Sequence, residues 1–255
     1  MIKEIYTYRE MLFNLVRRDL RARYKASMLG FLWTFINPLM QLAIYSIVFP
    51  YLMKVTEENY TMFLFVALLP WTAFTASIQN GTTCIIGNAD MVKKIYFPRS
   101  ILPLSVVCTN MINYLYCMVI VLVVLPLSGI GFSWYILWFP IIFIIEFLLA
   151  YGFCLILSAL NVAYRDIEHI VGIITMAWFY ATPILYNMDV LPEKILTLYK
   201  ANPMVGIIVG FRNVLFYQTS PNLKYLCYDL LFAATLIFIG QKLFDNASKT
   251  FAEEL

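Results

Sequence analysis

Six apolar runs most constrain what this chain can fold into. Each run is 18 to 27 residues long, and together they cover Leu29–Met53, Thr61–Gln79, Ile101–Leu127, Tyr135–Ala159, Ile170–Asn187 and Tyr225–Phe244. A helix needs about 20 apolar residues to cross a hydrocarbon layer of about 30 Å. Lipid cannot satisfy backbone polar groups, and these runs lack the alternation of barrel strands. The sequence therefore predicts an all-α integral membrane protein with six transmembrane helices.

The composition supports this class. Hydrophobic residues make up 62% of the chain and charged residues only 13%, whereas soluble domains carry about a quarter charged residues. A soluble fold would have too little polar surface to cover its core. The net charge of +3 gives nucleic-acid binding no electrostatic basis. We expect a single transmembrane domain over residues 1–255.

Lysine and arginine set the expected orientation. Thirteen of the 18 basic residues lie in segments 1–28, 80–100, 161–169 and 241–255, which share one side of the membrane if six helices cross it. Basic residues accumulate on the cytoplasmic side. We therefore expect both termini in the cytoplasm, and the resemblance described below implies a bacterial plasma membrane.

Two regions are neither spans nor simple loops. Residues 1–25 place apolar residues at helical spacing beside several arginines, which predicts an amphipathic helix in the inner headgroup layer, with a disordered basic tail as the alternative. Segment 188–224 contains two apolar pieces, about 190–199 and 203–217, each too short to cross. We expect two short re-entrant or surface helices, broken at Ala201-Asn202-Pro203.

Several chemistries are missing from the sequence. No GxxxxGK[ST] phosphate loop occurs, so the chain is not expected to bind ATP in the usual way, and neither GxSxG nor HExxH is present. The cysteines are scattered, which indicates no zinc site. Glu146 lies in the middle of an apolar run. Such a residue faces protein or water, either as a contact in a transport path or as a hydrogen-bonding group between helices.

The stretch NVAYRDIEHIV, residues 161–171, concentrates charge between two apolar runs. Arg165, Asp166, Glu168 and His169 fall within five positions, and His169 is the chain's one histidine. A metal site would need further histidine or cysteine partners, and a catalytic histidine would need a nucleophile. Docking of another protein fits better. A solvated turn with a local Arg165–Glu168 pair is the alternative.

Several stretches together resemble the membrane subunits of ABC transporters that export polysaccharides such as O-antigen and teichoic acid. They are, in order, RRDLRARYKASMLGFLWTFINPL, NADMVKKIYFPRSILPLS, NVAYRDIEHIVGIITMAWFYATPILY, NPMVGIIVGFRNVLF and the FAEEL tail. The resemblance covers essentially the whole chain. It implies a homodimer of this chain with two copies of a separate ATPase, which binds the ATP and Mg²⁺, and no cofactor on the chain itself.

The resemblance also implies roles for particular residues. Cytoplasmic loops Asn88–Ser100 and Asn161–His169 match coupling helices that contact the ATPase, with candidates Asn88, Asp90, Lys93, Lys94, Arg99, Arg165, Asp166, Glu168 and His169. Residues 188–217 match external gate helices, with candidates Pro192, Pro203, Phe211 and Arg212. Residues 1–25 match an element beside a lateral entry for lipid-linked substrate.

A sugar polymer on a polyprenyl diphosphate needs a passage through protein, because it is too polar for the bilayer core. The diphosphate should sit where basic residues collect, at Arg17, Arg18, Arg21, Arg23 and Lys25, unless these residues only anchor the chain to headgroups. Aromatic rings can line the passage because their faces suit the C–H surfaces of sugars. The candidates for the lining, together with Glu146, are Trp33, Phe35, Tyr45, Phe49, Trp178, Phe179, Tyr180 and Tyr186; packing or lipid contact is the alternative for each aromatic. Pro38 and Pro183 are expected to bend the first and fifth helices.

Two other readings stay open at the level of sequence. The first is an ABC permease for a drug, a small lipid or an ion, since the wider fold is shared. The second is a membrane-embedded enzyme of lipid-linked sugar metabolism, for which Asp166, Glu168 and His169 come closest to an acidic or histidine cluster.

Overall fold

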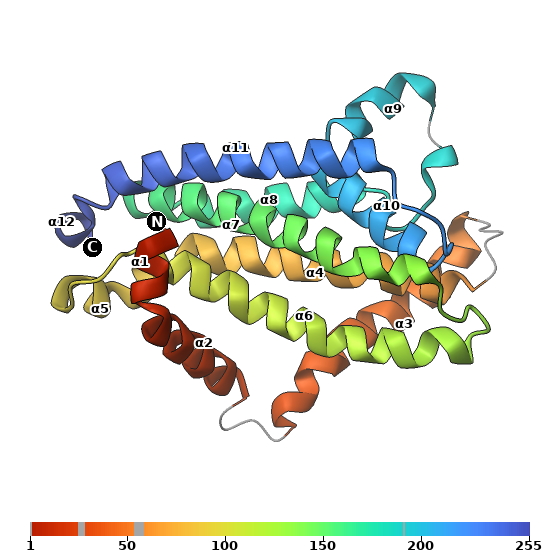
Figure 1. Ribbon diagram of the computed structural model, residues 1–255, viewed down its shortest axis with the longest axis horizontal. Coiled ribbons are helices and arrows are strands. Elements are labelled where there is room, and N and C mark those ends of the chain that lie inside the picture. The colour runs from red at the N-terminus through yellow and green to blue at the C-terminus, as the bar shows by residue number, and fades with distance from the viewer. Residues whose placement is uncertain (1, 25–28, 54–58, 191) are drawn as a thin grey trace.

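Every regular element in the described part of the chain is a helix. The computed structural model describes residues 2–24, 29–53, 59–190 and 192–255 (Figure 1). The α-helices are α1 (Ile2–Thr7), α2 (Arg9–Tyr24), α3 (Trp33–Met53), α4 (Tyr60–Thr83), α5 (Ala89–Lys94), α6 (Ile101–Leu127), α7 (Phe139–Ala163), α8 (Ile167–Tyr180), α9 (Glu193–Lys200), α10 (Pro203–Leu215), α11 (Leu223–Ala247) and α12 (Phe251–Glu254). Short 3-10 helices are η1 (Gly30–Leu32), η2 (Ile86–Asn88), η3 (Trp134–Trp138) and η4 (Met188–Val190).

Four of the described helical segments are long and apolar enough to cross a membrane. They are Tyr60–Thr83, Ile101–Leu127, Trp134–Ala163 and Leu223–Ala247. Three shorter apolar helices cover Trp33–Phe49, Ile167–Tyr180 and Pro203–Leu215. The prediction of an all-helical fold with several helices that could cross a membrane is confirmed for the described residues.

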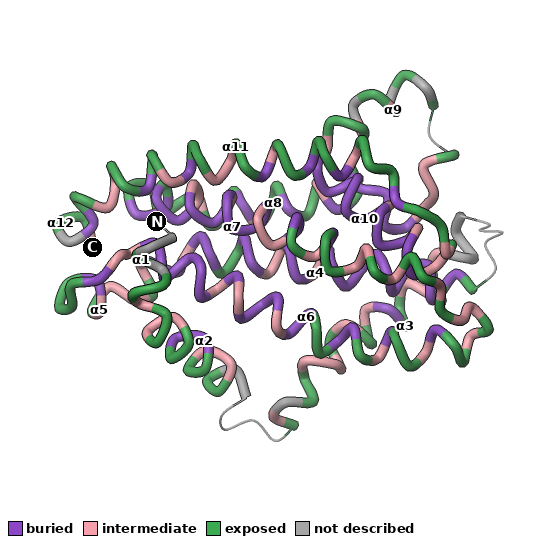
Figure 2. Tube along the Cα trace, viewed as in Figure 1, coloured by how far each residue is buried: buried purple, intermediate pink, exposed green. Residues whose placement is uncertain are grey.

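The core is built around α4, which packs against α3, α6, α7, α8 and α10. Figure 2 shows its buried residues running along nearly the whole helix. Such all-round burial requires an apolar surface on every side. Beside it, α7 and α11 form the most extensive helix pair. A Cβ atom at Gly152 would lie only 2.8 Å from the Leu236 Cβ, so glycine is what lets these two helices approach so closely.

The predicted helix ends differ from the observed ones by a few residues. The third predicted span coincides with α6. The second continues to Thr83 rather than Gln79, and the fourth to Ala163 rather than Ala159. In each case the helix extends past its apolar stretch into more polar residues, because the hydrophobic pattern reports burial rather than the last backbone hydrogen bond. The sixth helix is likewise longer at both ends, as Leu223–Ala247.

The fifth predicted span, Ile170–Asn187, is wrong at both ends. Helix α8 covers Ile167–Tyr180, which is about 21 Å at 1.5 Å per residue. Turns follow it, in which the Thr182 amide donates to the Phe179 carbonyl at 3.3 Å. Pro183 therefore lies beyond the helix and cannot bend it. Proline lacks an amide hydrogen and disfavours helical geometry in the preceding residue, so it helps to end the helix here. Pro38, by contrast, does lie inside α3.

The N-terminal region and the segment after α8 are helical as expected. Residues 2–24 form α1 and α2, so the disordered-tail alternative is wrong for them. Leu15 and Val16 of α2 are buried against the core, and α2 packs on α6. The segment after α8 forms α9 and α10. Asn202 separates them and caps α10, because its Oδ1 accepts from the Met204 amide at 3.0 Å.

The long helices run between two ends of the molecule (Figure 1). Figure 1 shows α5 and α12 at one end and α9 at the other. Helix α12 contacts both α5 and the C-terminal part of the bundle at α7. The turn between α7 and α8 also lies at this α5/α12 end, at the green-to-teal segment beside α12 (Figure 1).

Candidate functional site

The turn between α7 and α8 holds the charged stretch that the sequence singled out. Asn161 joins the end of α7 to the start of α8, because its Oδ1 accepts a hydrogen bond from the Glu168 amide at 3.2 Å. Residues 163–166 and 168–170 are exposed. Among the described residues of this turn, His169 Nε2 lies 3.7 Å from Glu168 Oε1, a contact that is an ion pair only when the histidine is protonated. The alternative Arg165–Glu168 pair is not formed there. The turn therefore presents its charges outward and is held by the buried Asn161.

Segment 86–100 forms a second exposed feature at the same end. Lys94 pairs with Asp90 at 3.0 Å on the surface of α5. Arg99 instead points inward: its guanidinium donates to the Ser248 carbonyl and lies 5.8 Å from the centre of the Phe251 ring. Arg99 thus ties this segment to the C-terminal helices and is less accessible than the coupling role predicts. The other two coupling candidates of this segment are Lys93, which is exposed, and Asn88, which is partly buried.

Two residues of this segment were not predicted. Tyr96 is 96% exposed and its neighbour Ile95 is 56% exposed, directly after the lysines of α5. A protruding aromatic side chain is a typical anchor for a protein partner. The sequence signal was the IYF triplet between charged residues, but the sequence alone does not tell that Phe97 is buried while Tyr96 is not.

A basic cleft is lined by residues of α2 and of α6, which pack against each other. It has a volume of about 1,570 Å³. The residues that line it are Arg9, Leu12, Phe13, Asn14, Val16, Arg17, Arg18, Leu20, Arg21, Ala22, Cys108, Ile112 and Tyr116. Arg17 and Arg21 are exposed, whereas Arg18 pairs with Asp19 at 2.9 Å and donates to the Asn88 side chain at 3.0 Å. The structure thus brings together three of the five predicted basic residues.

The side chains of the other two basic candidates are not among those that the structure describes. Lys25 lies outside the described residues, and for Arg23 only the backbone, within α2, is described. The cleft combines cationic side chains with an apolar wall from α6. Such a surface suits an anionic headgroup that is attached to an apolar chain.

The aromatic candidates for a passage divide into two groups. Trp33 and Tyr180 are more than 40% exposed. The others are buried or partly buried against the core: Phe35, Tyr45, Phe49, Trp178, Phe179 and Tyr186. Trp178 is the clearest packed case, because its ring lies 5.4 Å from that of Phe74 and its Nε1 donates to Asn202 Oδ1 at 2.9 Å. Of these eight aromatic candidates, Trp33 and Tyr180 are the two with exposed side chains.

Glu146 is fully buried inside the subunit on α7. It lies close enough to Tyr114 of α6 for the two groups to interact electrostatically. Neither carboxyl oxygen has a hydrogen-bond partner among the described residues. A residue that lines a passage between subunits would be accessible in a single chain, so this placement favours a role between helices.

The external candidates lie around the α8–α10 connection. Pro203 is the first residue of α10 and is buried, which suits proline because its missing amide hydrogen costs nothing there. Phe211 is fully buried and Arg212 is 3% exposed, whereas Pro192 is exposed. The sequence missed Asn202 as an organising residue. Its Nδ2 donates to the Ala181 carbonyl at 3.1 Å, and this ties α10 to the end of α8.

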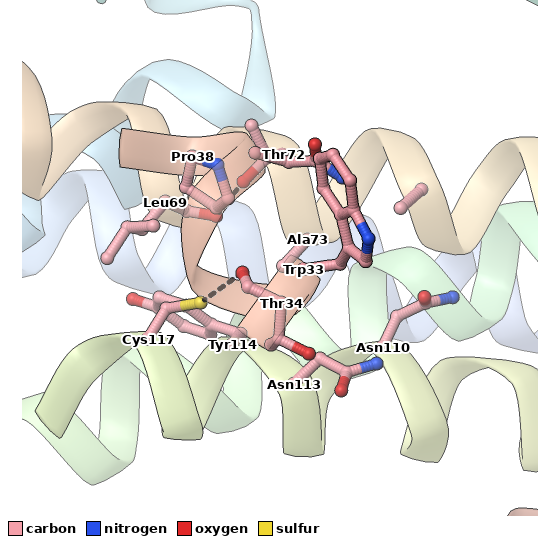
Figure 3. A pocket seen from close by; sticks show the side chains of 12 residues that line it. Trp33, Thr34, Pro38, Leu69, Thr72, Ala73, Asn110, Asn113, Tyr114 and Cys117 are labelled. Carbon is pink, nitrogen blue, oxygen red and sulfur yellow. Dashed lines mark hydrogen bonds between the residues drawn. The ribbon is translucent and has the colours of Figure 1, made fainter. Parts of the chain in front are cut away.

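A further pocket, here called the α3–α6 pocket, lies between α3, α4 and α6 (Figure 3). Its volume is about 260 Å³. It is lined by Trp33, Thr34, Asn37, Pro38, Leu69, Thr72, Ala73, Ala76, Asn110, Asn113, Tyr114 and Cys117. Of these, the sequence predicted only Trp33 as a site residue. No group of three metal-ligating residues occurs among the described residues.

The sequence matches that of a known transporter family. Residues 10–216 match the family model described as ABC-2 type transporter, so the chain belongs to the ABC-2 type transporter family. Membership makes it a multi-pass membrane transport subunit rather than an enzyme and implies a separate ATPase partner.

Named relatives extend over the full chain. It is 33% identical over 257 residues to the O-antigen export system permease protein RfbA of Myxococcus xanthus, covering 100% of this chain and 99% of that protein. An O-antigen export system permease protein RfbA of Klebsiella pneumoniae is 36% identical over 249 residues, covering 96% and 95%. The polysialic acid transport protein KpsM of Escherichia coli is 22% identical over 237 residues, covering 89% of each chain.

Proposed function

We propose that this chain is the membrane permease of an ATP-driven exporter for a cell-surface polysaccharide. The observation that carries the proposal is similarity over the whole length to proteins named O-antigen export permeases. An exporter of this kind needs both a passage and a partner that hydrolyses ATP. The chain has no phosphate loop, so the energy would come from a separate subunit.

The proposed topology has six spans with both termini in the cytoplasm. Helix α3 is 21 residues long, about 31 Å, and can cross alone. Helix α8 is shorter and would cross together with the turns that follow it, where backbone groups are satisfied by protein. In this orientation the α5/α12 end faces the cytoplasm and α9 and α10 form an external gate. The excess of basic residues on the cytoplasmic side supports this orientation.

The proposed substrate is a glycan linked to a polyprenyl diphosphate. Its lipid tail can stay in the bilayer if the headgroup enters from the side. The basic cleft supports such an entry, because Arg17 and Arg21 are exposed beside the apolar wall formed by Ile112 and Tyr116. Each cation near an anionic group contributes about 1 kcal/mol.

The proposed assembly is a homodimer of this chain with two ATPases at the inner face. Segment 86–100 and the α7–α8 turn would contact the ATPases, because both are exposed at the α5/α12 end. Arg99 would pass movement of the first segment to α11 and α12 through its contacts with Ser248 and Phe251. The passage for the glycan would lie between the two copies.

Reconstitution tests the proposal. The chain and its ATPase are placed in vesicles with polyprenyl diphosphate-linked O-antigen-type polysaccharide, and transfer to the opposite leaflet is followed with a glycan-specific lectin. We expect transfer only with ATP and both proteins. Transfer by the permease alone, or export of a drug, ion or small lipid in place of the glycan, would contradict it.

The basic cleft gives a sharper prediction in the same assay. Replacing both Arg17 and Arg21 by Gln should raise the substrate concentration for half-maximal transfer by about 30-fold, since two cationic contacts of about 1 kcal/mol each are lost. The matched control replaces Lys194 and Lys200 of α9 by Gln, at the opposite end of the molecule. An equal effect of the two double substitutions would show that only overall charge matters.

A further inference from the structure

Arg18 of α2 connects the basic cleft to the segment that follows α4. It lines the cleft, and its Nη2 donates to Asn88 Oδ1 at 3.0 Å, across 70 residues of sequence. Arg17 and Arg21 lie one turn apart on an exposed face of α2. Arg18 instead follows the buried Leu15 by three residues and so borders the packed face of the helix. This cation therefore reaches both the cleft and the segment that carries Asn88.

Asn88 uses its side-chain amide twice in this connection. It occupies the N-cap position of α5, where asparagine commonly caps the helix. Among the described residues, however, its side chain makes no capping bond to α5. Its Oδ1 accepts from Arg18, and its Nδ2 donates to the Cys84 carbonyl at 2.8 Å, directly after α4. Both groups of the amide therefore hold the start of α5 to α2 and α4.

The guanidinium of Arg18 can bind an anion without releasing Asn88. It pairs with Asp19 at 2.9 Å, but the Arg18 side chain is still 47% exposed, and ion pairs at such exposed positions are weak. The bonds that Arg18 makes to described residues use its Nε and Nη2 atoms. Nη1 also carries N–H donors, which suit a phosphate oxygen. A diphosphate has more negative charge than one carboxylate, so it competes well with Asp19 for this cation.

A shift of Asn88 would reach the surface that the proposed ATPase contacts. Asn88 directly precedes α5, a helix of six residues whose hydrogen bonds keep them in fixed relative positions. The exposed Tyr96 follows two residues after the end of this helix. Movement at the start of α5 is therefore passed on to the protruding part of the segment.

We propose that the Arg18–Asn88 bond transmits occupancy of the basic cleft to the ATPase. The occupant is the diphosphate headgroup of the lipid-linked glycan, so the inference rests on the proposed function. The headgroup draws Arg18 away from Asp19 and toward the cleft, and Asn88 follows through its hydrogen bond. Arg18 contacts the substrate, whereas Asn88 is a positioning residue that acts through Arg18. The exporter then hydrolyses ATP faster when its headgroup site is filled.

ATP hydrolysis by the complete exporter tests this connection. Permease and ATPase are placed together in phosphatidylcholine vesicles, and polyprenyl diphosphate-linked O-antigen-type polysaccharide is titrated. In the wild type, saturating lipid should raise the hydrolysis rate about fivefold or more, the lower end of typical coupling between two sites. Asn88→Ala should reduce this ratio to about one. Its affinity for the radiolabelled lipid, measured by equilibrium binding without nucleotide, should stay unchanged.

A conservative variant separates transmission from a structural role of Asn88. Asn88→Asp keeps an acceptor for Arg18 but loses the donor to the Cys84 carbonyl. It should therefore retain the stimulation by lipid. If Asn88 served only to hold the end of α4, Asn88→Asp would behave like Asn88→Ala. Asn246→Ala is the matched control, because it removes the same amide from an exposed position near the end of α11 and should stimulate as the wild type does.

Two arginine variants separate binding of the lipid from transmission. Arg17→Gln should weaken lipid binding about fivefold, because one cationic contact is lost. Saturating lipid should nevertheless stimulate this variant as it does the wild type. Arg18→Gln should lose both affinity and stimulation, because it removes the cation and its bond to Asn88 together.

The possible results distinguish the two ideas. Full stimulation of Asn88→Ala, or equal loss in Asn88→Ala and Asn88→Asp, overturns the transmission and leaves the exporter proposal standing. The same holds if the wild type transfers glycan without any stimulation by the lipid, or if phosphatidylglycerol stimulates it equally. A wild-type complex that neither binds nor transfers the lipid-linked glycan overturns the proposed function, and the inference with it.

Discussion

Arg212 in α10 is a buried cation that is surrounded by backbone carbonyls. Its guanidinium donates to the carbonyls of Phe63, Pro183, Ile184 and Tyr186, and it lies 3.6 Å from the centre of the Phe63 ring. Three of these carbonyls belong to the turns after α8, which no longer bond within a helix. Arg212 therefore takes over the hydrogen bonding of that segment and joins it to α4 and α10.

Substitution of Arg212 tests this role. Arg212→Leu would leave several buried carbonyls without a donor, so the free energy of unfolding should fall by about 3 kcal/mol or more. Unfolding of the purified protein in mixed micelles, followed by tryptophan fluorescence, measures the change. Arg212→Lys should lie in between, because an ammonium group cannot reach all four carbonyls. Arg165→Leu, at an exposed position, is the control and should be neutral. Wild-type stability in Arg212→Leu would contradict the role.

At the scale of elements, the α7–α11 pair depends on two glycines. A Cβ atom at Gly152 would come within 3.2 Å of the Ile237 amide nitrogen, and one at Gly240 within 3.1 Å of the Gly152 carbonyl oxygen. These neighbours are backbone atoms, which cannot rotate away. Close packing through small residues is how helices associate where lipid removes the hydrophobic driving force.

A larger residue at this contact should therefore force the helices apart. We expect Gly152→Val to lower the free energy of unfolding by about 1–3 kcal/mol, as for other overpacked contacts. Gly172→Ala in α8 is the matched control, because a Cβ there meets nothing within 4 Å. It should be neutral or stabilise slightly, since alanine favours helix over glycine. Equal stability of the two variants in the mixed-micelle assay would rule out a close contact at Gly152.

Hydrophobic pattern predicted most of these elements. The span equal to α6 and the amphipathic α2 follow from residue spacing, and the break at Ala201-Asn202-Pro203 follows from the proline. The end of α8 did not follow. Its apolar stretch continues past Tyr180, but tertiary contacts from Arg212 and Asn202 allow the backbone to leave the helix there. Those partners are 20 to 30 residues away in sequence, so no local rule includes them.

The candidate sites show the same limit. Residue spacing predicted an amphipathic basic helix over residues 1–25, because periodicity on one helix is a local property, but it did not predict the cleft that α2 forms with α6. The α3–α6 pocket required three helices in a particular rotation, and Asn110 and Asn113 in sequence are only two polar residues within an apolar run. Aromatic residues were equally ambiguous. Trp178 and Phe179 have the composition of a passage lining, yet the register of α8 turns them onto α4.

For the whole molecule, the asymmetry of the two ends matters most. At the α5/α12 end, Ile95, Tyr96 and the turn around Arg165 are exposed. At the same end, Arg99 contacts Ser248 and Phe251 and so attaches segment 86–100 to the C-terminal helices. A partner that grips Tyr96 would therefore act on α6 and α11 together. This makes the protruding pair, rather than the surface charges of α5, the expected anchor for the ATPase.

Truncation of the anchor should weaken the complex. Tyr96→Ala is expected to reduce the affinity of the permease for its ATPase by at least about tenfold, because aromatic anchors at interface centres contribute more than 1 kcal/mol. Asp90→Asn should change it little, since Asp90 is exposed and already paired with Lys94, and such surface pairs contribute about 0–1 kcal/mol. Affinity is measured by titrating the purified ATPase onto the permease in nanodiscs.

The matched control for Tyr96→Ala is Trp134→Ala, which removes an 87% exposed aromatic from η3. Helix η3 begins the helical segment Trp134–Ala163, whose other end leads into the α7–α8 turn, so in the proposed topology Trp134 lies on the opposite side of the membrane from the ATPase. Its loss should leave the affinity unchanged. If Trp134→Ala weakens the complex as much as Tyr96→Ala does, or if Tyr96→Ala binds normally, the ATPase does not dock through segment 86–100. Two explanations would then remain: the ATPase docks at the α7–α8 turn, or the orientation of the two ends is reversed. Asp166→Lys distinguishes them, because it should lower the affinity only if the ATPase docks at that turn.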